Sequence, residues 1–412
     1  MKVLVFGGNG KMGQAVAYDL AREDAVEKIG LVGRTRTTLL SAKAWLKSPK
    51  IALHPLDVTD RKALMKLMAS YDVGVSTLPD RRTSYALAHA AVEAGLSYAD
   101  MLEEYHRRPD LYELEGLNLP RGLKLYDYGD WLHERAVANG VTFMDGIGFA
   151  PGLSNVTCGE AIRKLDKAEV CVARVGGIPR KDVAKVKPLR YMITWAFWHV
   201  LREYNVKLFI LKNGRRVEVD AATEREAFLF DKLGKREPLE CAITPGMPSF
   251  IYTRPKLKYF AEKTVRWPGH WDGVQTLKEC GLLSLKPVEV DGVPVVPRDL
   301  LLACIEPQLK RRPGETDVCV MYNTVEGVRD GGRVRYSYHM WDEADRKTGI
   351  SSMGRVTGFP AAIGAVMIGK GMIREKGIVP PEDCIYGKGY AYFTKELAKR
   401  KIRILETKEV LT

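Results

Sequence analysis

The feature that most constrains this chain is a glycine-rich turn directly after its first apolar run. Val3–Phe6 reads as a strand buried on both faces, because it is continuously apolar and largely β-branched. The turn carries Gly8, Gly10 and Gly13 and leads into residues with helical periodicity. This spacing between a strand and a helix is typical of dinucleotide-binding folds, where the glycines permit the tight turn, the approach of a pyrophosphate and close helix packing. The alternative is a glycine-rich turn with a structural role alone.

The end of the second expected strand, Lys28–Val32, indicates which dinucleotide binds. Sites for NAD usually place Asp or Glu here, where the carboxylate binds the ribose 2′-hydroxyl. This chain instead has Gly33, followed by Arg34, Thr35 and Arg36. Two guanidinium groups and a hydroxyl suit a 2′-phosphate, whereas a carboxylate would repel it. The sequence therefore favours NADP and leaves NAD possible, and the alternative is that both arginines are solvated loop charges.

Short strands alternate with helices up to about residue 145, which predicts a Rossmann-type, doubly wound parallel sheet in an α/β domain. Ligands of such sheets lie at the carboxyl ends of the strands. Asp57 follows the third expected strand, where it either contacts the adenine side of the site or caps a turn. The residues expected to bind the cofactor are Gly8, Asn9, Gly10, Lys11, Met12, Gly13, Arg34, Thr35, Arg36, Asp57, Val58, Thr77, Leu78 and Pro79.

The pattern changes after Glu169 to longer alternating runs separated by turn signals. We expect a second α+β domain with a mixed or antiparallel sheet at 151–350, after a dinucleotide-binding domain at 1–150. A small-residue helix around 357–376 is expected to complete the first domain, and 377–412 to form a C-terminal segment. Within the second domain, Met192–Trp198 is expected as a core helix, and Glu203–Tyr204 as its solvated end.

Two places in and before this second domain suggest substrate chemistry. The helix start at Gly152, Ser154 and Asn155 follows the sixth expected strand and suits a carboxylate, or it forms a rigid interdomain elbow. Farther on, Arg266 could bind a carboxylate and His270 could transfer a proton at neutral pH. A histidine in a Pro-Gly turn can equally be structural.

Composition limits the other function classes. The formal net charge is +13, from 64 Lys and Arg against 51 Asp and Glu, but the basic residues are dispersed. We therefore expect solvated surface or small-anion binding rather than a nucleic-acid face. The seven cysteines show no metal-ligand spacing, which predicts reduced thiols and no metal site. No apolar stretch approaches the ~20 residues of a membrane span, so a cytoplasmic protein is expected.

Together these motifs resemble the saccharopine dehydrogenase family in its broad sense. The most specific matches are Gly148–Asn155, Val175–Pro179 and Val265–His270, supported by the glycine turn and by Gly358–Ala362. The A-P-G-L-S-N and R-W-P-G-H sequences are closest to the lysine 6-dehydrogenase branch. The Gly33-Arg34 strand end departs from an NAD-type lysine dehydrogenase and agrees better with the NADP preference of glutamate-forming saccharopine dehydrogenases.

The resemblance implies an NAD(P)-dependent oxidation of the CH–NH group of a lysine-derived amino acid, with hydride transfer to nicotinamide and hydrolysis of the imine. It marks Asp100, Tyr105 and His270 as candidates for proton transfer. It marks Arg266 and the helix start at Gly152, Ser154 and Asn155 as candidates for substrate binding, and it implies a homodimer. A carboxynorspermidine-type dehydrogenase and a non-catalytic NADP-binding sensor are the alternatives.

Overall fold

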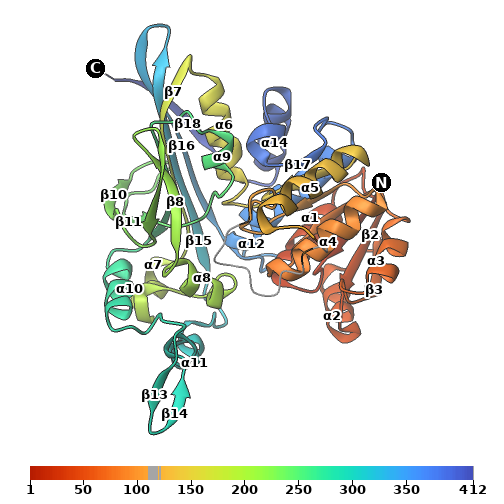
Figure 1. Ribbon diagram of the computed structural model, residues 1–412, viewed down its shortest axis with the longest axis horizontal. Coiled ribbons are helices and arrows are strands. Elements are labelled where there is room, and N and C mark those ends of the chain that lie inside the picture. The colour runs from red at the N-terminus through yellow and green to blue at the C-terminus, as the bar shows by residue number, and fades with distance from the viewer. Residues whose placement is uncertain (110–118, 120–121, 412) are drawn as a thin grey trace. The chain divides into compact units, whose positions relative to one another are not determined.

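The structure is a computed structural model that describes residues 1–109, 119 and 122–411. The chain forms two compact units, each built from several segments (Figure 1). Unit 1 comprises Met1–Glu160, Met247–Ser249 and Gly354–Lys401, and unit 2 comprises Ala161–Gly246, Phe250–Met353 and Ile402–Thr412. The last part of the chain is divided between the units, with Gly354–Lys401 in unit 1 and Ile402–Thr412 in unit 2.

Unit 1 is a doubly wound α/β fold, as expected. Among the described residues its sheet has seven strands in the order β17-β6-β5-β4-β1-β2-β3, and every neighbouring pair is parallel. Strands follow β1 on both of its sides, so the connecting helices cover both faces of the sheet. Its elements in the first segment are β1 Lys2–Phe6, α1 Lys11–Leu20, β2 Lys28–Gly33, α2 Arg36–Leu46, β3 Ile51–Pro55, α3 Arg61–Met68, β4 Val73–Ser76, α4 Arg81–Ala94, β5 Tyr98–Asp100, α5 Leu125–Ala138 and β6 Thr142–Asp145, and α6 Leu153–Arg163 begins in this segment and ends in unit 2.

The C-terminal part of the chain returns to unit 1 and completes it. Helix α12 (Ser352–Gly369) packs against α1, where Gly358 lies so close that a β-carbon on it would sit 2.9 Å from the Ala15 side chain. Strand β17 (Gly377–Val379) then pairs with β6 and adds an edge strand that the sequence patterns did not predict. The short helix α13 (Pro381–Cys384) and the longer α14 (Lys388–Lys399) follow.

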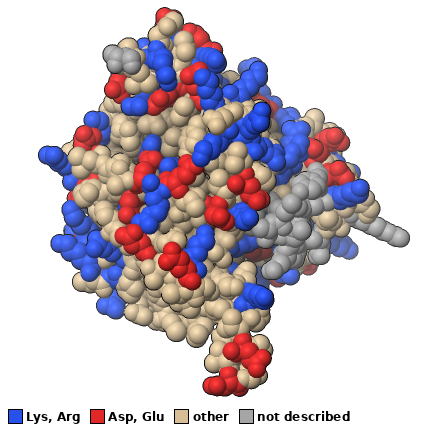
Figure 2. Space-filling view, turned by 60° about the vertical axis from the view of Figure 1, so that its left-hand side comes forward, with Lys and Arg blue, Asp and Glu red and all other residues tan. Residues whose placement is uncertain are grey.

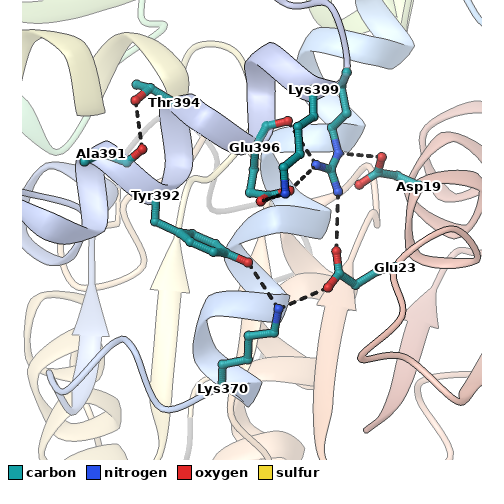
Figure 3. A network of polar contacts seen from close by, with 9 residues as sticks. Asp19, Glu23, Lys370, Ala391, Tyr392, Thr394, Glu396 and Lys399 are labelled. Atoms are coloured by element: carbon teal, nitrogen blue, oxygen red, sulfur yellow. Dashed lines mark hydrogen bonds and ion pairs between the residues drawn. The ribbon is translucent and has the colours of Figure 1, made fainter.

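An ion-pair network fastens α14 to α1 (Figure 3). Arg400 donates from Nε to Asp19 Oδ1 at 2.6 Å and from Nη1 to Glu396 Oε2 at 2.8 Å. Lys370 joins Glu23 Oε1 at 3.0 Å and Tyr392 Oη at 3.2 Å. These ion pairs therefore stabilise α1, the helix that begins at the glycine turn, against the segment that contains α14.

Within the described part of the chain, unit 2 is built on a mixed nine-stranded sheet in which β7 and β12 pair in parallel and the other pairs are antiparallel, as the sequence predicts. Its elements are β7 Lys167–Pro179, α7 Lys181–Ala184, the 3₁₀ turn η2 Pro188–Arg190, α8 Phe197–Glu203, β8 Lys207–Lys212, β9 Arg215–Asp220, β10 Glu226–Phe230, β11 Glu237–Ile243, α9 Phe250–Thr253, β12 Tyr259–Arg266, α10 His270–Glu279, β13 Val288–Val290, β14 Val293–Val295, α11 Pro297–Leu309, β15 Asp317–Arg329, β16 Gly332–Glu343 and β18 Leu405–Val410.

Helices α8, α10 and α11 gather at one end of this sheet, and the β13–β14 hairpin projects beyond α11 (Figure 1). Basic and acidic side chains are interspersed over the face seen in Figure 2. Among the described residues, none of the helices has the length and apolar character that crossing a membrane requires.

Candidate functional site

The glycine turn has the geometry of an anion cradle. Gly7 adopts a φ of +76°, and Gly10 closes the turn by donating its N–H to the Gly7 carbonyl at 2.9 Å. A β-carbon at Gly13 would lie 2.3 Å from that same carbonyl oxygen, so only glycine fits there. The N–H groups of Lys11, Met12 and Gly13 find no acceptor within the described residues. Free N–H groups at a helix start are an established setting for phosphate.

A pocket of about 720 Å³ lies beside this turn, at the carboxyl ends of β1 to β4. It contains seven of the fourteen residues expected to bind the cofactor: Asn9, Arg34, Thr35, Asp57, Val58, Leu78 and Pro79. Gly8, Gly10, Lys11, Met12 and Gly13 form the adjoining turn and helix start, Arg36 begins α2, and Thr77 donates its hydroxyl to the Phe6 carbonyl at 2.8 Å. Arg82, at the start of α4, also lines the pocket and was missed from the sequence.

Asp57 forms a turn with Thr59 at the lining of the pocket. Its Oδ1 accepts from the Thr59 N–H at 2.9 Å and from the Thr59 hydroxyl at 2.8 Å, while the residue lines the pocket. These hydrogen bonds from Thr59, with smaller effects from the guanidinium groups of Arg34 and Arg82, hold the pKa of Asp57 below its usual value. The next helix is capped by Asp60, which accepts from Ala63 N–H at 3.1 Å. Asp57 is thus an ionised turn residue inside the pocket.

The pocket fits NADP better than NAD. The end of β2 offers no carboxylate for a ribose 2′-hydroxyl, and Arg34 and Thr35 stand exposed at the pocket. Arg36 is also exposed, at the first turn of α2. The free N–H groups of the α1 start suit a pyrophosphate, and the guanidinium groups suit a 2′-phosphate.

A buried chain of polar side chains begins at the carboxyl end of β5. The Ser84 hydroxyl donates to Asp100 Oδ2 at 3.1 Å and lies 2.8 Å from His106 Nε2, and His106 Nδ1 lies 2.7 Å from Asp145 Oδ1. Burial raises the pKa of Asp100. Burial alone would lower the pKa of His106, but the Asp145 carboxylate raises it above its usual value. The chain links the expected proton-transfer residue Asp100 to the hydrogen-bonded pair of His106 and Asp145.

His106 was not singled out from the sequence, although it follows Glu103-Glu104-Tyr105 in the loop after the fifth strand. A polar loop at the carboxyl edge of a parallel sheet is the signal that could have identified it. The loop is fixed by Glu104, which accepts from Arg81 Nε at 3.0 Å and from the Tyr85 hydroxyl at 3.0 Å. Tyr105 is buried, and burial raises the pKa of its hydroxyl.

The helix start after β6 holds three expected substrate residues in different environments. Gly152 has a φ of +132°, and a β-carbon there would lie 2.2 Å from Gly148 N. Asn155 accepts from Gly152 N–H at 2.9 Å and donates to Ser249 Oγ at 3.1 Å and Glu382 Oε2 at 2.9 Å, so its amide holds unit 1 together. Ser154 Oγ is fully buried and makes no hydrogen bond to any described residue. Of these three residues, Ser154 is the one whose side chain has no hydrogen-bond partner among the described residues.

In unit 2, Arg266 is held beneath two tyrosines. Its Nε donates to Tyr204 Oη at 3.0 Å, its Nη1 donates to the Gly177 and Val265 carbonyls, and its guanidinium carbon lies 5.1 Å from the Tyr191 ring centre. Nη2 makes no hydrogen bond to the described part of the chain. A buried guanidinium with a spare edge is a receptor for a carboxylate.

His270 contacts the tyrosine that holds Arg266. Its Nδ1 lies 2.8 Å from the Leu189 carbonyl and its Nε2 lies 3.1 Å from Tyr204 Oη. Burial, with the nearby Arg266 charge, lowers the pKa of His270 to about 3. The ring is therefore neutral at physiological pH, with Nδ1–H donating to Leu189 and Nε2 accepting from the tyrosine.

Two expectations for this region are wrong. Helix α8 begins at Phe197 rather than at Met192, because Thr194 and Trp195 form a bend and Ile193 N–H bonds to the Leu309 carbonyl at 3.0 Å. Glu203 and Tyr204 are buried, not solvated, since Tyr204 packs edge-on against Trp271. We call the following residues the polar core of unit 2: Tyr191, Thr194, Glu203, Tyr204, Glu262, Arg266 and His270.

The expected residues thus fall into separate groups. The cofactor residues, Asp100, Tyr105 and the helix start at Gly152–Asn155 belong to unit 1, whereas Arg266 and His270 belong to unit 2. In this second group the sequence did not identify Tyr191, Glu203, Tyr204 or Glu262.

Comparisons with known proteins assign most of the chain to one family. Residues 3–144 match the saccharopine dehydrogenase NADP binding domain, and residues 148–402 match the saccharopine dehydrogenase C-terminal domain. The carboxyaminopropylagmatine dehydrogenase of Synechocystis sp. is 23% identical over 396 residues, covering 93% of this chain and 92% of that protein. The NADP-dependent, L-glutamate-forming saccharopine dehydrogenase of Schizosaccharomyces pombe is 21% identical, with 90% and 91% covered.

A solved structure shares the fold over the full length. The apo L-Glu-forming saccharopine dehydrogenase of Saccharomyces cerevisiae superposes with a TM-score of 0.76 at 21% sequence identity, covering 99% of each chain. The resemblance drawn from the motifs and the preference for NADP are both confirmed. Because the two matched domains span most of the sequence, the chain belongs to the saccharopine dehydrogenase family of NADP-binding oxidoreductases.

Proposed function

We propose that the protein catalyses the NADP-dependent oxidation of the CH–NH group of an N-substituted amino acid, together with the reverse reductive reaction. The observation that carries this proposal is Arg266, a buried guanidinium that Tyr204 holds in place and whose Nη2 has no partner in the described structure. Such a group binds the carboxylate of an amino acid. The family assignment and the names of the relatives support the reaction type.

When bound, NADP supplies the hydride acceptor. The carbon beside the amine loses a hydride and the nitrogen loses a proton, which leaves an imine. Water then adds to the imine carbon and the C–N bond breaks, so that the products are a carbonyl compound and a free amine. The protein must bind the carboxylate and accept or return protons.

For the protons we propose the buried chain from Asp100 through Ser84 to His106. Its members lie within hydrogen-bonding distance of one another, and the raised pKa of Asp100 suits a group that takes up and releases a proton. Tyr105 stays the second candidate. For His270 we propose a positioning role, because both ring nitrogens are engaged and its pKa is about 3.

The sequence also predicts a lysine-derived substrate of the saccharopine or lysine 6-dehydrogenase type, a homodimer and a cytoplasmic location, and we keep these as part of the proposal. The carboxynorspermidine-type substrate is the alternative.

The test is the reduction of NADP, followed by nicotinamide absorbance, with a panel of lysine, saccharopine and carboxynorspermidine. Turnover with one of these amines that is lost in Asp100→Asn, while NADP binding persists, supports the proposal. A protein that binds NADP tightly and turns over none of the panel or their imine precursors in reverse would instead fit a sensor.

A further inference from the structure

The pocket beside the glycine turn has two kinds of lining. The loop after β2 contributes Arg34 and Thr35, followed by Arg36 at the start of α2, so this part is cationic and polar. A phosphate suits such a lining, whereas the flat face of a purine suits an apolar one. The loops after β3 and β4 supply the apolar lining, which consists of Leu56, Val58, Leu78 and Pro79.

Arg82 is a cation beside this apolar lining. It is the second residue of α4, it is exposed, and it lines the pocket. Its neighbour Arg81 is buried and pairs with the carboxylate of Glu104. The Arg82 guanidinium forms no hydrogen bond or ion pair with any residue that the structure describes. Arg82 therefore presents an unpaired cation to the pocket.

The local structure does not stabilise this cation. The start of a helix carries a partial positive charge, so a guanidinium there is unfavourable. The first turn of α4 contains no acidic residue. The residue before the helix, Asp80, uses its two carboxylate oxygens to accept from the N–H and the hydroxyl of Thr83, at 2.9 and 2.7 Å. A residue that opposes the local preference at the edge of a pocket is typical of a functional position.

The side chain of Arg82 extends over the pocket toward the loop after β3. In the sheet, β1 and β2 separate β4 from β3, and neighbouring strands lie about 4.8 Å apart. Hydrogen bonds from Thr59 are the main cause of the low pKa of Asp57 at the end of β3, but the charges of Arg34 and Arg82 also lower it. The guanidinium of Arg82 thus acts on a residue on the opposite side of the pocket.

The base of the cofactor fits Arg82 better than a phosphate does. Two carboxylates, Asp57 and Asp80, line the pocket on the side of β3 and β4, where they would repel a phosphate. The end of β2 instead has two arginines and no acid. Adenine is uncharged, and a planar guanidinium stacks on the face of an aromatic ring. The apolar lining beside Arg82 suits the same base.

We propose that Arg82 binds the adenine ring of NADP by stacking its guanidinium plane on the base. Arg34 and Arg82 then act on different parts of one cofactor. Arg34 binds the 2′-phosphate and selects NADP, whereas Arg82 contributes equally to the binding of NADP and of NAD. This inference concerns the cofactor alone, so it does not depend on the reaction or on the amine substrate proposed above.

The test measures the dissociation constants of NADP and NAD for the full chain by isothermal titration calorimetry. Arg82→Ala should weaken both cofactors about fivefold. Arg82→Lys keeps the charge but not the plane, so it should lose as much as Arg82→Ala. Arg82→Tyr keeps a flat face without the charge, so it should stay within about twofold of wild type. Lys66→Ala, which removes a positive charge at an exposed position on α3 outside the pocket, is the control and should change neither constant.

Two further measurements locate the effect. Adenosine 2′,5′-bisphosphate, which lacks the nicotinamide half, should lose the same fivefold in Arg82→Ala, and thermal melting should show that each variant is folded. A loss for NADP with NAD unchanged, or full recovery in Arg82→Lys, would make Arg82 a phosphate ligand and overturn the inference. Unchanged binding in Arg82→Ala, or a loss in Arg82→Tyr as large as in Arg82→Ala, would overturn it as well.

Discussion

Asn9 fills the space that a side chain at Gly33 would need. A β-carbon at Gly33 would lie 2.3 Å from Asn9 Oδ1, and the Asn9 amide is anchored by donating from Nδ2 to Thr38 Oγ1 at 3.2 Å. The acid that binds a ribose 2′-hydroxyl in NAD sites is missing from the sequence, and a side chain at position 33 would have to displace the Asn9 amide. The glycine turn and the second strand together select the phosphorylated cofactor.

Removal of Arg34 should weaken NADP selectively. In Arg34→Ala the dissociation constant for NADP is expected to rise about tenfold, because a charge-assisted bond to the 2′-phosphate is lost, while that for NAD stays the same. Titration of both cofactors, monitored by calorimetry, measures this. Lys43→Ala, an exposed site in the last turn of the following helix α2, is the control. An equal loss for NAD and NADP would show that Arg34 does not read the 2′-phosphate.

Gly13→Ala should abolish cofactor binding. Its β-carbon would meet backbone, the Gly7 carbonyl at 2.3 Å, so the turn and the start of α1 must move apart. Gly332→Ala is the comparison, since the nearest atom to its β-carbon is 3.8 Å away. Calorimetric titration with NADP and thermal melting distinguish lost binding from unfolding. Normal NADP affinity in Gly13→Ala would refute the assignment of the cradle.

The interior of unit 1 was largely predictable because its signals are local. Gly8, Gly10 and Gly13 act within one turn, and the apolar runs of β1 and β4 fit strands buried on both faces. Strand β17 was not predicted, because it has only three residues and its partner β6 lies more than two hundred residues earlier in the sequence. Nothing within Gly377–Val379 specifies that pairing.

The polar core of unit 2 was predicted only in part for a related reason. Arg266 and His270 lie in a distinctive motif, but Glu203 and Tyr204 read as an ordinary helix end. Their burial follows from packing of α8 against Trp271 and β12, which brings together segments over sixty residues apart. Periodicity could not reveal this, because the backbone at Ile193 bonds to Leu309 instead of continuing a helix.

Arg400→Met should destabilise unit 1 by about 3 kcal/mol at neutral pH, because it leaves the buried Asp19 carboxylate without its partner. Burial already raises the pKa of Asp19 above its ordinary value, so this group favours folding at low pH and its contribution is lost as the pH rises through the folded pKa. The defect of the variant should therefore shrink under acid conditions. Urea unfolding at several pH values measures it, and the exposed Arg403→Met serves as control. A defect that does not change with pH would contradict this account.

The His106–Asp145 pair predicts a pH dependence of stability. The pKa of His106 in the folded chain lies above its ordinary value of 6.5, so its contribution is complete below pH 6.5 and is lost as the pH rises through the folded value. For one proton the slope is at most about 1.4 kcal/mol per pH unit. Glu262, with a pKa of about 8, has the same sign in an overlapping window. The measurement is therefore the difference in slope between wild type and His106→Asn, and identical slopes would refute the prediction.

Tyr204→Phe should affect the amine substrate and not the cofactor. The hydroxyl accepts from Arg266 and lies against His270, so its loss frees the guanidinium to turn away. We expect KM for the amine to rise about tenfold, as for the loss of one positioned charge-assisted bond, with KM for NADP unchanged. Steady-state kinetics with each reactant varied in turn checks this. A rise in KM for both the amine and NADP would show that Tyr204 supports the stability of the protein rather than substrate binding.

The central claim is that this chain transfers a hydride between the CH–NH group of an amino-acid amine and NADP. The most direct measurement is NADP reduction by the amine panel, in wild type, Arg266→Lys and Arg34→Ala. The account predicts turnover with at least one carboxylate-bearing amine, a higher KM for that amine in Arg266→Lys, and a higher KM for NADP alone in Arg34→Ala. Turnover by no amine in either direction, with NADP still tightly bound, would contradict it.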